Sequence, residues 1–319
     1  MQIFSLDAES DFACRLAAAL GEPLSPHEDR GFEDGEHKWR PLVDPRGEHV
    51  YVVASLHGGP EQSPHDKLCR LLMFVATLRD HGAASLTAVV PYLAYARKDR
   101  QTKPFDPLAL RYVAQLLEAV GTDRVIVLEA HNVAAFQNAF RLPTLHIEAH
   151  RAFDRVATEL AGTVPVAVAS PDPGGVKRAQ LWRESLEQQL ARPVGFAMVD
   201  KRRSDGVMTS SRLVAGSVVG ATVLLLDDLI ASGETVRSAA LALREAGARE
   251  VIAFAAHGLF IPPAAQVLTD PAITSVIVTD SVPPFRLPSD GPVGARLVVV
   301  SAAPLFAQAI RACHVRRPD

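Results

Sequence analysis

The chain has 319 residues, a length that predicts about two domains because globular domains usually contain roughly 100–200 residues. Its composition, 48% hydrophobic and 22% charged, predicts a folded chain with a sizeable core rather than a disordered one. A formal net charge of −3 and apolar runs of about eight residues at most argue against a general affinity for nucleic acid and against a bilayer-spanning segment.

Apolar, β-branched runs recur along the chain and predict strands. They are nearly continuous rather than alternating in polarity, which is typical of parallel strands buried on both faces. The runs are HVYVVASL (49–56), LTAVVPYL (86–93), RVIVLEA (124–130), VPVAVAS (164–170), VLLLDD (223–228), VIAFAAH (251–257), SVIVTD (275–280) and RLVVVSA (296–302).

Helical patterns lie between these strands. The segment 106–121 carries one apolar stripe, with Asp106 as the expected N-cap and Gly121 as the expected stop. The segments 63–82 and 234–248 are built in the same way. Alternation of strand and helix along the whole chain predicts a doubly wound α/β architecture.

The two halves of the chain show a weak internal pairing. Around 89–131, and again around 223–257, a strand, a charged loop, a helix and a strand that leads to a His follow one another. We therefore predict two similar doubly wound parallel-sheet domains, 1–148 and 149–319. No low-complexity linker separates them, and the last helix is a candidate to pack back on the N-terminal domain.

The N-terminus and the cysteines indicate a reducing compartment. The opening sequence MQIFSLDAESDF is acidic and lacks the basic segment of a signal peptide. Cys14, Cys69 and Cys313 are far apart and odd in number, so they indicate neither a metal site nor a disulfide framework. We expect buried thiols in a cytoplasmic protein.

Polar residues that follow the strands of the first half are candidates for a site, because ligands of open parallel sheets bind beyond the carboxyl ends of the strands. The segment 91–101 ends in cations that include Arg97 and Lys98, and this suits a polyphosphate. His131 follows the next strand, beside Glu129, where both could contact phosphates that carry magnesium. A purely structural hydrogen bond is an equal alternative for His131.

Two clusters follow strands early in the second half. In SPDPGGVKRAQ, Asp172 precedes a Gly-Gly pair that opens a helix, which suits a phosphate or a metal–phosphate complex. A Pro-Gly turn capped by Asp172 is the structural alternative. In DKRRSDG, Lys201 and Arg203 could neutralise charge on a phosphoryl group, although an ordinary solvated charge run remains open.

The stretch VLLLDDLIASGETV combines an acid pair with a glycine turn. Asp227 and Asp228 end an apolar strand, and a turn with Ser232 and Thr235 leads into a helix. The turn suits an anion, whereas the acids suit sugar hydroxyls or a metal. A ribose phosphate satisfies both, with its 5-phosphate on the turn and its hydroxyls on the acids. The alternative is a surface turn with a helix-capping acid pair.

The common nucleotide and hydrolase fingerprints are missing from the sequence. It contains no GxxxxGK[ST], no GxGxxG after a strand, no HExxH and no GxSxG. The chain therefore has phosphate-handling features without a Walker-type or Rossmann-type nucleotide motif.

In this order, the clusters resemble the ribose-phosphate pyrophosphokinase family, also called phosphoribosyl pyrophosphate synthetases. The resemblance runs almost from end to end. The similar segments are GFEDGEHKWR (31–40) for the adenine-contacting loop, PYLAYARKDRQ for the ATP-binding strand and loop, SPDPGGVKRA and DKRR for the helix opening and the catalytic loop, LLLDDLIASGET for the ribose-phosphate loop, and VVSAAPLFAQAIRACH (299–314) for the closing strand and helix.

The resemblance implies a reaction and an assembly. The family transfers the β,γ-diphosphoryl group of ATP to the 1-hydroxyl of ribose 5-phosphate, which gives phosphoribosyl pyrophosphate and AMP for nucleotide biosynthesis. Both domains would have the phosphoribosyltransferase-like fold, with ATP on the N-terminal side and ribose 5-phosphate on the C-terminal side. Magnesium would be the cofactor, and a cytoplasmic homo-oligomer, dimer or hexamer, is implied.

The resemblance also assigns residues. Lys201 and Arg203 would be catalytic, because they stabilise the charge that moves with the diphosphoryl group. His131 and Asp172 would serve magnesium. The residues implied for ribose 5-phosphate are Asp227, Asp228, Ser232, Gly233 and Thr235. The residues implied for ATP are Phe32, Asp34, Glu36, Arg97, Lys98 and His131, of which the first three reach adenine from a neighbouring subunit in the family.

Four positions depart from the family pattern. Lys98 stands where Gln is usual, Glu129 where Asp is usual, and Ala231 where an acid is usual. Glu234 replaces a small residue and brings an anion near the expected phosphate turn, unless it points outward as a first-turn helix residue.

Two other functions share part of this pattern. A phosphoribosyltransferase that consumes phosphoribosyl pyrophosphate would keep the 223–236 loop but would not need FEDGEHKW or YARKDR. A weakly active regulatory homologue of the synthetase would tend to lose its catalytic loop or its acid pair. Here Lys201, Arg203, Asp227 and Asp228 are all present.

Overall fold

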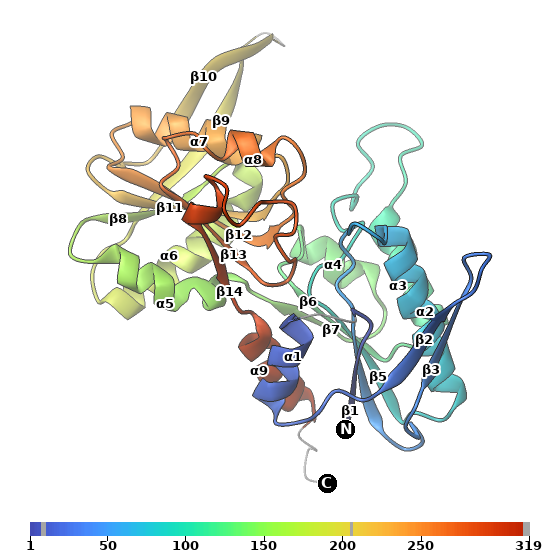
Figure 1. Cartoon of the computed structure of the whole chain (residues 1–319). Helices are drawn as coiled ribbons and strands as arrows, with labels where there is room; N and C mark the ends of the chain where they lie inside the picture. The colour runs from blue at the N-terminus through green and yellow to red at the C-terminus, as the bar shows by residue number, and fades with distance from the viewer. Residues whose placement is uncertain (8–10, 205–206, 315–319) are drawn as a thin grey trace. The chain divides into compact units, whose positions relative to one another are not determined.

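A computed structural model describes residues 1–7, 11–204 and 207–314 (Figure 1). The chain forms two compact units, one made of residues 1–148 together with the chain from residue 301 onward, and one made of residues 149–300. Each unit is built on its own mainly parallel sheet with helices beside it, so the predicted doubly wound α/β class is confirmed.

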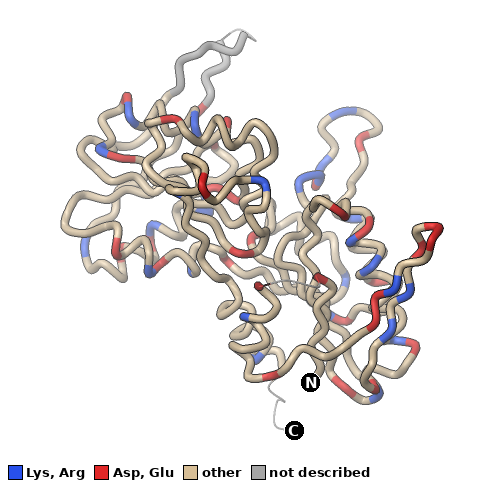
Figure 2. The backbone as a smooth tube through the Cα atoms, viewed as in Figure 1, with Lys and Arg blue, Asp and Glu red and all other residues tan. Residues whose placement is uncertain are grey.

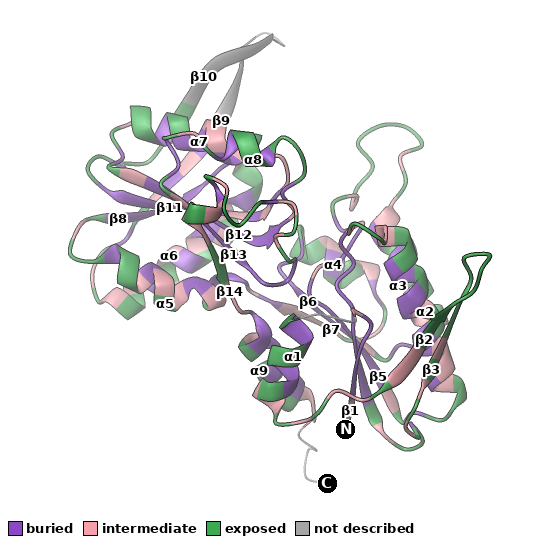
Figure 3. Ribbon diagram, in the orientation of Figure 1, coloured by how far each residue is buried: buried purple, intermediate pink, exposed green. Residues whose placement is uncertain are grey.

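The first unit contains a five-stranded sheet in which all strands are parallel. The strand order is β1 (Gln2–Ser5), β4 (His49–Val53), β5 (Ser85–Val90), β6 (Arg124–Leu128) and β7 (Thr144–Ile147). The helices of this unit are α1 (Asp11–Leu20), α2 (Pro64–Asp80), α3 (Ala109–Ala119), α4 (Val133–Ala139) and α9 (Ala303–His314). Figure 3 shows the sheet as mostly buried, while the helices present exposed faces.

Helix α9 belongs to the first unit although it lies at the end of the chain. It packs against α1, where the rings of Phe12 and Phe306 meet edge to face with centroids 5.2 Å apart. Both side chains are almost completely buried. The Arg311 guanidinium also donates to the Ala19 carbonyl oxygen. The described end of the chain is thus a structural part of the N-terminal unit.

A separate antiparallel hairpin, formed by β2 (His27–Gly31) and β3 (His37–Pro41), makes the third sheet. Figure 1 shows it extending away from the five-stranded sheet, and we call residues 27–41 the arm. The arm lies outside the predicted strand runs, because its strands are polar and mostly exposed.

The second unit contains a seven-stranded sheet in which only β10 runs antiparallel to its neighbour. The strand order is β10 (Val207–Ala215), β9 (Gly195–Ser204), β8 (Val166–Ser170), β11 (Thr222–Ile230), β12 (Glu250–Gly258), β13 (Ser275–Thr279) and β14 (Leu297–Val300). The helices are α5 (His150–Ala161), the 3-10 turn η1 (Pro173–Gly175), α6 (Val176–Leu190), α7 (Glu234–Glu245), α8 (Ala264–Val267) and the 3-10 turn η2 (Gly294–Arg296).

Each predicted strand run contains a strand, and three details of the predictions are wrong. Strand β14 is not buried on both faces, because it lies at the edge of its sheet with Val298 and Val299 exposed. Helix α3 begins after Leu108 without a side-chain cap, so Asp106 is not its N-cap. Cys14 and Cys69 are exposed rather than buried.

The helices also test the predicted stop at Gly121. The stop at Gly121 is confirmed, since this residue follows α3 with a left-handed φ of 86°. Among residues 1–7, 11–204 and 207–314, no helix is both long and apolar enough to cross a bilayer.

Candidate functional site

The acid pair lies in the last part of β11. The backbone N–H of Asp228 donates to Asp227 Oδ1 at 2.9 Å, and the Asp228 side chain is buried. Burial raises the pKa of Asp227 well above its usual value, and the neighbouring charge of Asp228 raises it further, while Arg178 acts in the opposite direction. Two partly desolvated carboxylates are stabilised by hydroxyl donors or by a cation, so the pair suits either ligand.

The turn after β11 is built around one glycine. Gly233 has a φ of 81° and is the N-cap of α7. A Cβ at this position would lie 2.9 Å from Leu268 Cδ2, so both backbone conformation and packing require glycine. Ser232 and Thr235 stand on either side, both partly exposed. The first-turn N–H groups of a helix lack intrahelical partners and lie at its positive end, so this turn can bind an anion.

The side chain of Glu234 is directed along α7. Its Oε2 accepts from Nε and Nη2 of Arg237 at 3.2 and 3.1 Å. Arg237 Nη1 also lies 3.7 Å from Asp270 Oδ2. The acid that departs from the family pattern is therefore paired with a cation of its own helix.

The turn after β8 is capped by Asp172. One oxygen, Oδ1, accepts from the N–H groups of Gly174 and Gly175 at 2.8 and 3.2 Å. Ser170 Oγ donates to the Asp172 carbonyl oxygen at 2.6 Å, and a Cβ on Gly175 would lie only 2.6 Å from this hydroxyl. The capped Pro-Gly turn, which was the structural alternative, is thus present, and these bonds use one of the two carboxylate oxygens.

Arg178 was not singled out from the sequence. It lies in the first turn of α6, and its Nη1 would be 3.6 Å from a Cβ on Gly175. Its charge lowers the pKa of Asp227, opposing the larger effect of burial. The sequence signal was the Lys177–Arg178 pair, one residue after the Gly-Gly helix opening, and that signal is weak without the strand order.

The strand order brings three predicted segments to one edge of the second sheet. Strand β8 pairs in parallel with β11 on one side and β9 on the other. The Asp172 turn, the acid pair and the end of β9 therefore emerge at the carboxyl edge, where ligands of such sheets bind. Lys201 and Arg203 lie in β9, paired with β10 rather than in a loop, and their side chains lie outside the described residues.

The cationic loop after β5 is closed by an acid. Lys98 Nζ donates to Asp106 Oδ2 at 2.6 Å, and the same oxygen accepts from Thr102 Oγ1 at 2.7 Å and from the N–H of Lys103 at 3.0 Å. The Lys98 bond, together with those from Thr102, lowers the pKa of Asp106 strongly. Lys98 is therefore engaged inside the loop, whereas Arg97 is exposed.

Glu129 and His131, which follow β6, differ in burial. Glu129 is buried, has an unusual φ of 43°, and places Oε1 4.0 Å from His146 Nε2. His131 is exposed and immediately precedes Asn132, which caps α4 by accepting from the N–H of Ala135 at 3.1 Å.

No group of three or more His, Cys, Asp or Glu side chains is placed to hold a metal within the described part of the chain. His131 and Asp172, the two predicted metal residues, belong to different units. Magnesium commonly binds through one or two carboxylates, substrate phosphates and several waters, so the donors present fit a metal that arrives with a nucleotide.

The tip of the arm carries Phe32, Asp34 and Glu36. The Glu36 N–H donates to Asp34 Oδ1 at 3.0 Å, and the Phe32 N–H donates to the Glu36 carbonyl oxygen at 2.8 Å. The Phe32 side chain is 46% exposed, with the Arg30 guanidinium 5.5 Å from its ring centre. Figure 2 shows acidic residues at this tip. The tip is thus an ordered turn with an accessible aromatic ring.

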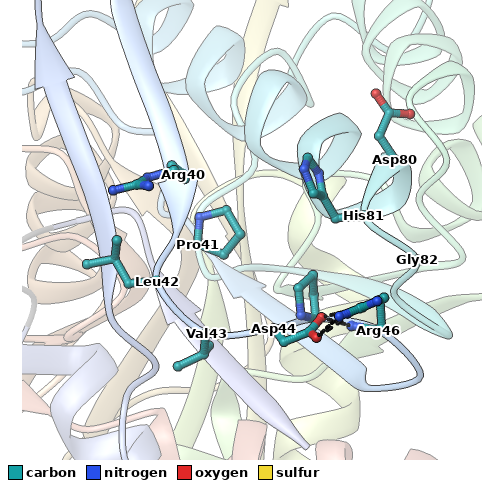
Figure 4. A pocket seen from close by; sticks show the side chains of 10 residues that line it. Arg40, Pro41, Leu42, Val43, Asp44, Arg46, Asp80, His81 and Gly82 are labelled. Carbon is teal, nitrogen blue, oxygen red and sulfur yellow. Dashed lines mark hydrogen bonds and ion pairs between the residues drawn. The ribbon is translucent and has the colours of Figure 1, made fainter.

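A hollow of about 740 Å³ lies at the base of the arm, beside the end of α2 (Figure 4). Asp44 and Arg46 form an ion pair of 2.6 Å on its wall, and the Arg46 guanidinium lowers the pKa of Asp44 to about 2. None of the predicted site residues lines this hollow.

Two parallel-sheet units, with an acid pair and a glycine turn joining β11 to α7, define a protein of the phosphoribosyltransferase-like class. Three family models match the chain: the N-terminal domain of ribose phosphate pyrophosphokinase at residues 1–121, a phosphoribosyl transferase domain at 142–259, and a phosphoribosyl synthetase-associated domain at 208–317. The chain belongs to the ribose-phosphate pyrophosphokinase family.

Individual relatives agree along the whole length. The ribose-phosphate pyrophosphokinase of Caldanaerobacter subterraneus is 33% identical over 314 residues, which cover 98% of this chain and 95% of that protein. Ribose-phosphate pyrophosphokinase 1 of Streptococcus agalactiae is 34% identical over 325 residues, with 100% and 95% coverage. The crystal structure of phosphoribosylpyrophosphate synthetase from Mycobacterium smegmatis matches with a TM-score of 0.84, 32% identity and 98% coverage of both chains. The family and fold predicted from the sequence are confirmed.

Proposed function

We propose that this chain is a ribose-phosphate diphosphokinase, which transfers the diphosphoryl group of ATP to the 1-hydroxyl of ribose 5-phosphate. The supporting observation is similarity to ribose-phosphate pyrophosphokinases over both units. A phosphoribosyltransferase alone would account for residues 142–259 but not for the N-terminal domain matched at residues 1–121. The reaction serves nucleotide biosynthesis.

Ribose 5-phosphate is assigned to the carboxyl edge of the second sheet. Its 5-phosphate accepts hydrogen bonds from the first-turn N–H groups of α7 and from the hydroxyls of Ser232 and Thr235, with Gly233 allowing close approach. Its ring hydroxyls donate to Asp227 and Asp228. Hydroxyl donors stabilise the charged form of these acids, so binding relieves the electrostatic cost of the pair.

ATP is assigned to residues of the first unit. Arg97 is exposed on the loop after β5 and can bind phosphate with two hydrogen bonds, while Lys98 keeps that loop closed through Asp106. Phe32 offers a ring for stacking on adenine. His131 is exposed and is assigned to the nucleotide phosphates. Because the arm tip is accessible, we assign the adenine contact to the arm of a second subunit in a cytoplasmic homo-oligomer.

The transfer needs positioning and charge neutralisation rather than a covalent nucleophile. The 1-hydroxyl oxygen attacks the β-phosphorus, the bond from that phosphorus to the α,β-bridging oxygen breaks, AMP leaves, and the hydroxyl proton is lost. Lys201 and Arg203 are assigned to the charge that develops on the moving group. Bound magnesium supplies additional positive charge on the phosphates, and Asp172 and His131 are the residues assigned to it.

Phosphorus NMR of the purified protein with ATP, magnesium and ribose 5-phosphate tests the proposal. AMP and a new sugar diphosphate signal, both absent without the sugar, are the expected products. Formation of ADP would show transfer of a single phosphoryl group and would refute the proposal. Binding of ribose 5-phosphate without turnover would favour a regulatory homologue, although Asp227, Asp228 and Asp172 are all present.

A further inference from the structure

The arm needs an anchor, because a two-stranded hairpin is marginally stable by itself. Its ladder joins β2 only to β3, and neither strand belongs to a main sheet. Backbone bonds near its base, from Ser25 N to the Ile3 oxygen and from Leu42 N to the Pro26 oxygen, hold only its root. The direction in which the tip points therefore depends on side chains.

One buried cation connects the arm to helix α2. Arg70 lies on α2 with its side chain only 9% exposed. Its Nη2 donates to Asp29 Oδ2 on β2, and its Nη1 donates to Gln62 Oε1 at 2.8 Å. The planar guanidinium holds both acceptors at once, which a lysine ammonium could not do with the same fixed geometry.

The same carboxylate also joins the two strands of the arm. While Asp29 Oδ2 binds Arg70, Asp29 Oδ1 accepts from His37 Nδ1 on β3 at 3.0 Å. The His37 ring stacks on the Trp39 ring at 5.5 Å with an interplanar angle of 8°. Helix α2, β2 and β3 are thus linked through one acid, and we call Arg70, Asp29 and His37 the arm anchor.

The other ion pairs of the arm lie within the arm itself and are more exposed than the pair of Arg70 and Asp29. Glu28 Oε2 lies 2.9 Å from Arg40 Nε and 3.1 Å from Lys38 Nζ, and all three residues belong to the arm itself. Arg40 is 57% exposed at its side chain. Exposed pairs of this type contribute little, and these do not reach α2. Arg40 therefore provides a matched control for Arg70.

We propose that the arm anchor fixes the direction of the arm, so that Arg70 is a positioning residue for nucleotide binding although it lies far along the chain from Phe32. The inference rests on the adenine contact assigned to the arm tip under the proposed function. An arm that is already held in one direction loses no orientational entropy when the nucleotide binds. Without Arg70, ATP binding would have to order the arm, and this entropic cost would weaken ATP binding while ribose 5-phosphate binding stays unchanged.

Equilibrium ATP binding by calorimetry tests the anchor in the full-length protein. Arg70→Met keeps most of the side-chain volume and removes the hydrogen bonds, and we expect ATP affinity to fall about tenfold, which is about 1.4 kcal/mol. Arg70→Lys should recover part of this loss. Arg40→Met should bind ATP like the wild type. In all three variants, the dissociation constant for ribose 5-phosphate should stay within about twofold of the wild-type value.

Trp39 gives a readout that does not depend on activity. The chain has two tryptophans, and the other, Trp182, is completely buried in the second unit. Acrylamide quenching therefore reports mainly on Trp39, and we expect stronger quenching in Arg70→Met but not in Arg40→Met. Unchanged quenching and ATP affinity in Arg70→Met, with only a lower Tm, would show a merely stabilising role and overturn the proposal.

Phe32→Ala separates failure of the anchor from failure of the assigned adenine contact. Loss of ATP affinity in Phe32→Ala but not in Arg70→Met would refute the anchor alone. Wild-type affinity in both variants would refute the assignment of adenine to the arm, and with it the anchor. The phosphorus NMR experiment is independent of both results, because it tests diphosphoryl transfer by the unmodified protein.

Discussion

Replacing Asp227 by Asn is expected to stabilise the unliganded protein at neutral pH and to weaken its binding of ribose 5-phosphate. Burial and the charge of Asp228 raise the pKa of Asp227 in the folded protein above its unfolded value. Stability from such a group is fully present below the unfolded pKa and is lost as the pH rises through the folded pKa. At neutral pH the ionised carboxylate of Asp227 therefore lowers the free energy of unfolding, whereas the neutral amide of the variant does not.

The size of the effect follows from the contacts of the pair. The amide oxygen of Asn can still accept the 2.9 Å bond from the N–H of Asp228, so the local geometry should be kept. Loss of the attraction to Arg178 offsets part of the gain. We expect a net stabilisation of about 1–2 kcal/mol, as is common when functional strain is removed. In a protein of this size this corresponds to a rise in Tm of about 2–8 °C.

Calorimetric scans across pH, with Asp80→Asn as an exposed control, measure this effect. The difference in Tm between Asp227→Asn and wild type should be small in acid and should grow toward neutral pH. Loss of a charge-assisted hydrogen bond of about 1.5–3 kcal/mol should weaken ribose 5-phosphate binding about 10- to 100-fold. An equal or lower Tm at neutral pH would refute the argument from the raised pKa.

Three further predictions concern the other assigned segments. Lys201→Ala is expected to lower kcat about 10²–10⁴-fold with unchanged far-ultraviolet circular dichroism, and wild-type turnover would contradict its assigned role. Gly233→Ala should lower the free energy of unfolding by about 1–3 kcal/mol in denaturant titrations, because of the left-handed φ and the 2.9 Å approach to Leu268, while a neutral result would mean that α8 can shift. Lys98→Gln and Asp106→Asn should raise the KM for ATP to a similar extent, about three- to tenfold, since both open the same loop closure. An effect of Lys98→Gln alone would instead indicate direct nucleotide contact.

Sequence periodicity was sufficient for β4, β5 and β6 in the first sheet and for β8, β11, β12 and β13 in the second, but it missed β1 and β7. The apolar run at β11, for example, needs no tertiary information, because continuous burial on both faces leaves a continuous hydrophobic signal. The arm left no such signal, since HEDRG and HKWRP are polar and are held by one another and by Arg70. Strand β9 was missed as a whole, since its second half, DKRRS, is polar and pairs with β10 instead of continuing an apolar run.

In the candidate site, too, the sequence predicted residues that have a local signal and missed residues whose role depends on the order of the strands. Asp227 and Asp228 could be found because strand ends are the usual ligand edge and acids there are conspicuous. Arg178 could not, because its effect on Asp227 exists only once β8 and β11 are neighbours. Asp106 was placed wrongly, because the local capping rule ignores the bonds from Lys98 and Thr102, which hold its carboxylate inside the loop.

The docking of α9 onto α1 has a consequence for the order of folding. During synthesis, residues 149–300 emerge as one continuous stretch and can assemble their whole sheet at once. The N-terminal unit begins earlier but is completed later, because Phe12 lacks its contact with Phe306 until the chain beyond residue 301 arrives. Exposed apolar surface of this kind makes nascent chains prone to aggregate. A ribosome that stalls shortly before the last helix would therefore release a chain whose first unit is unfinished and whose second unit is ready.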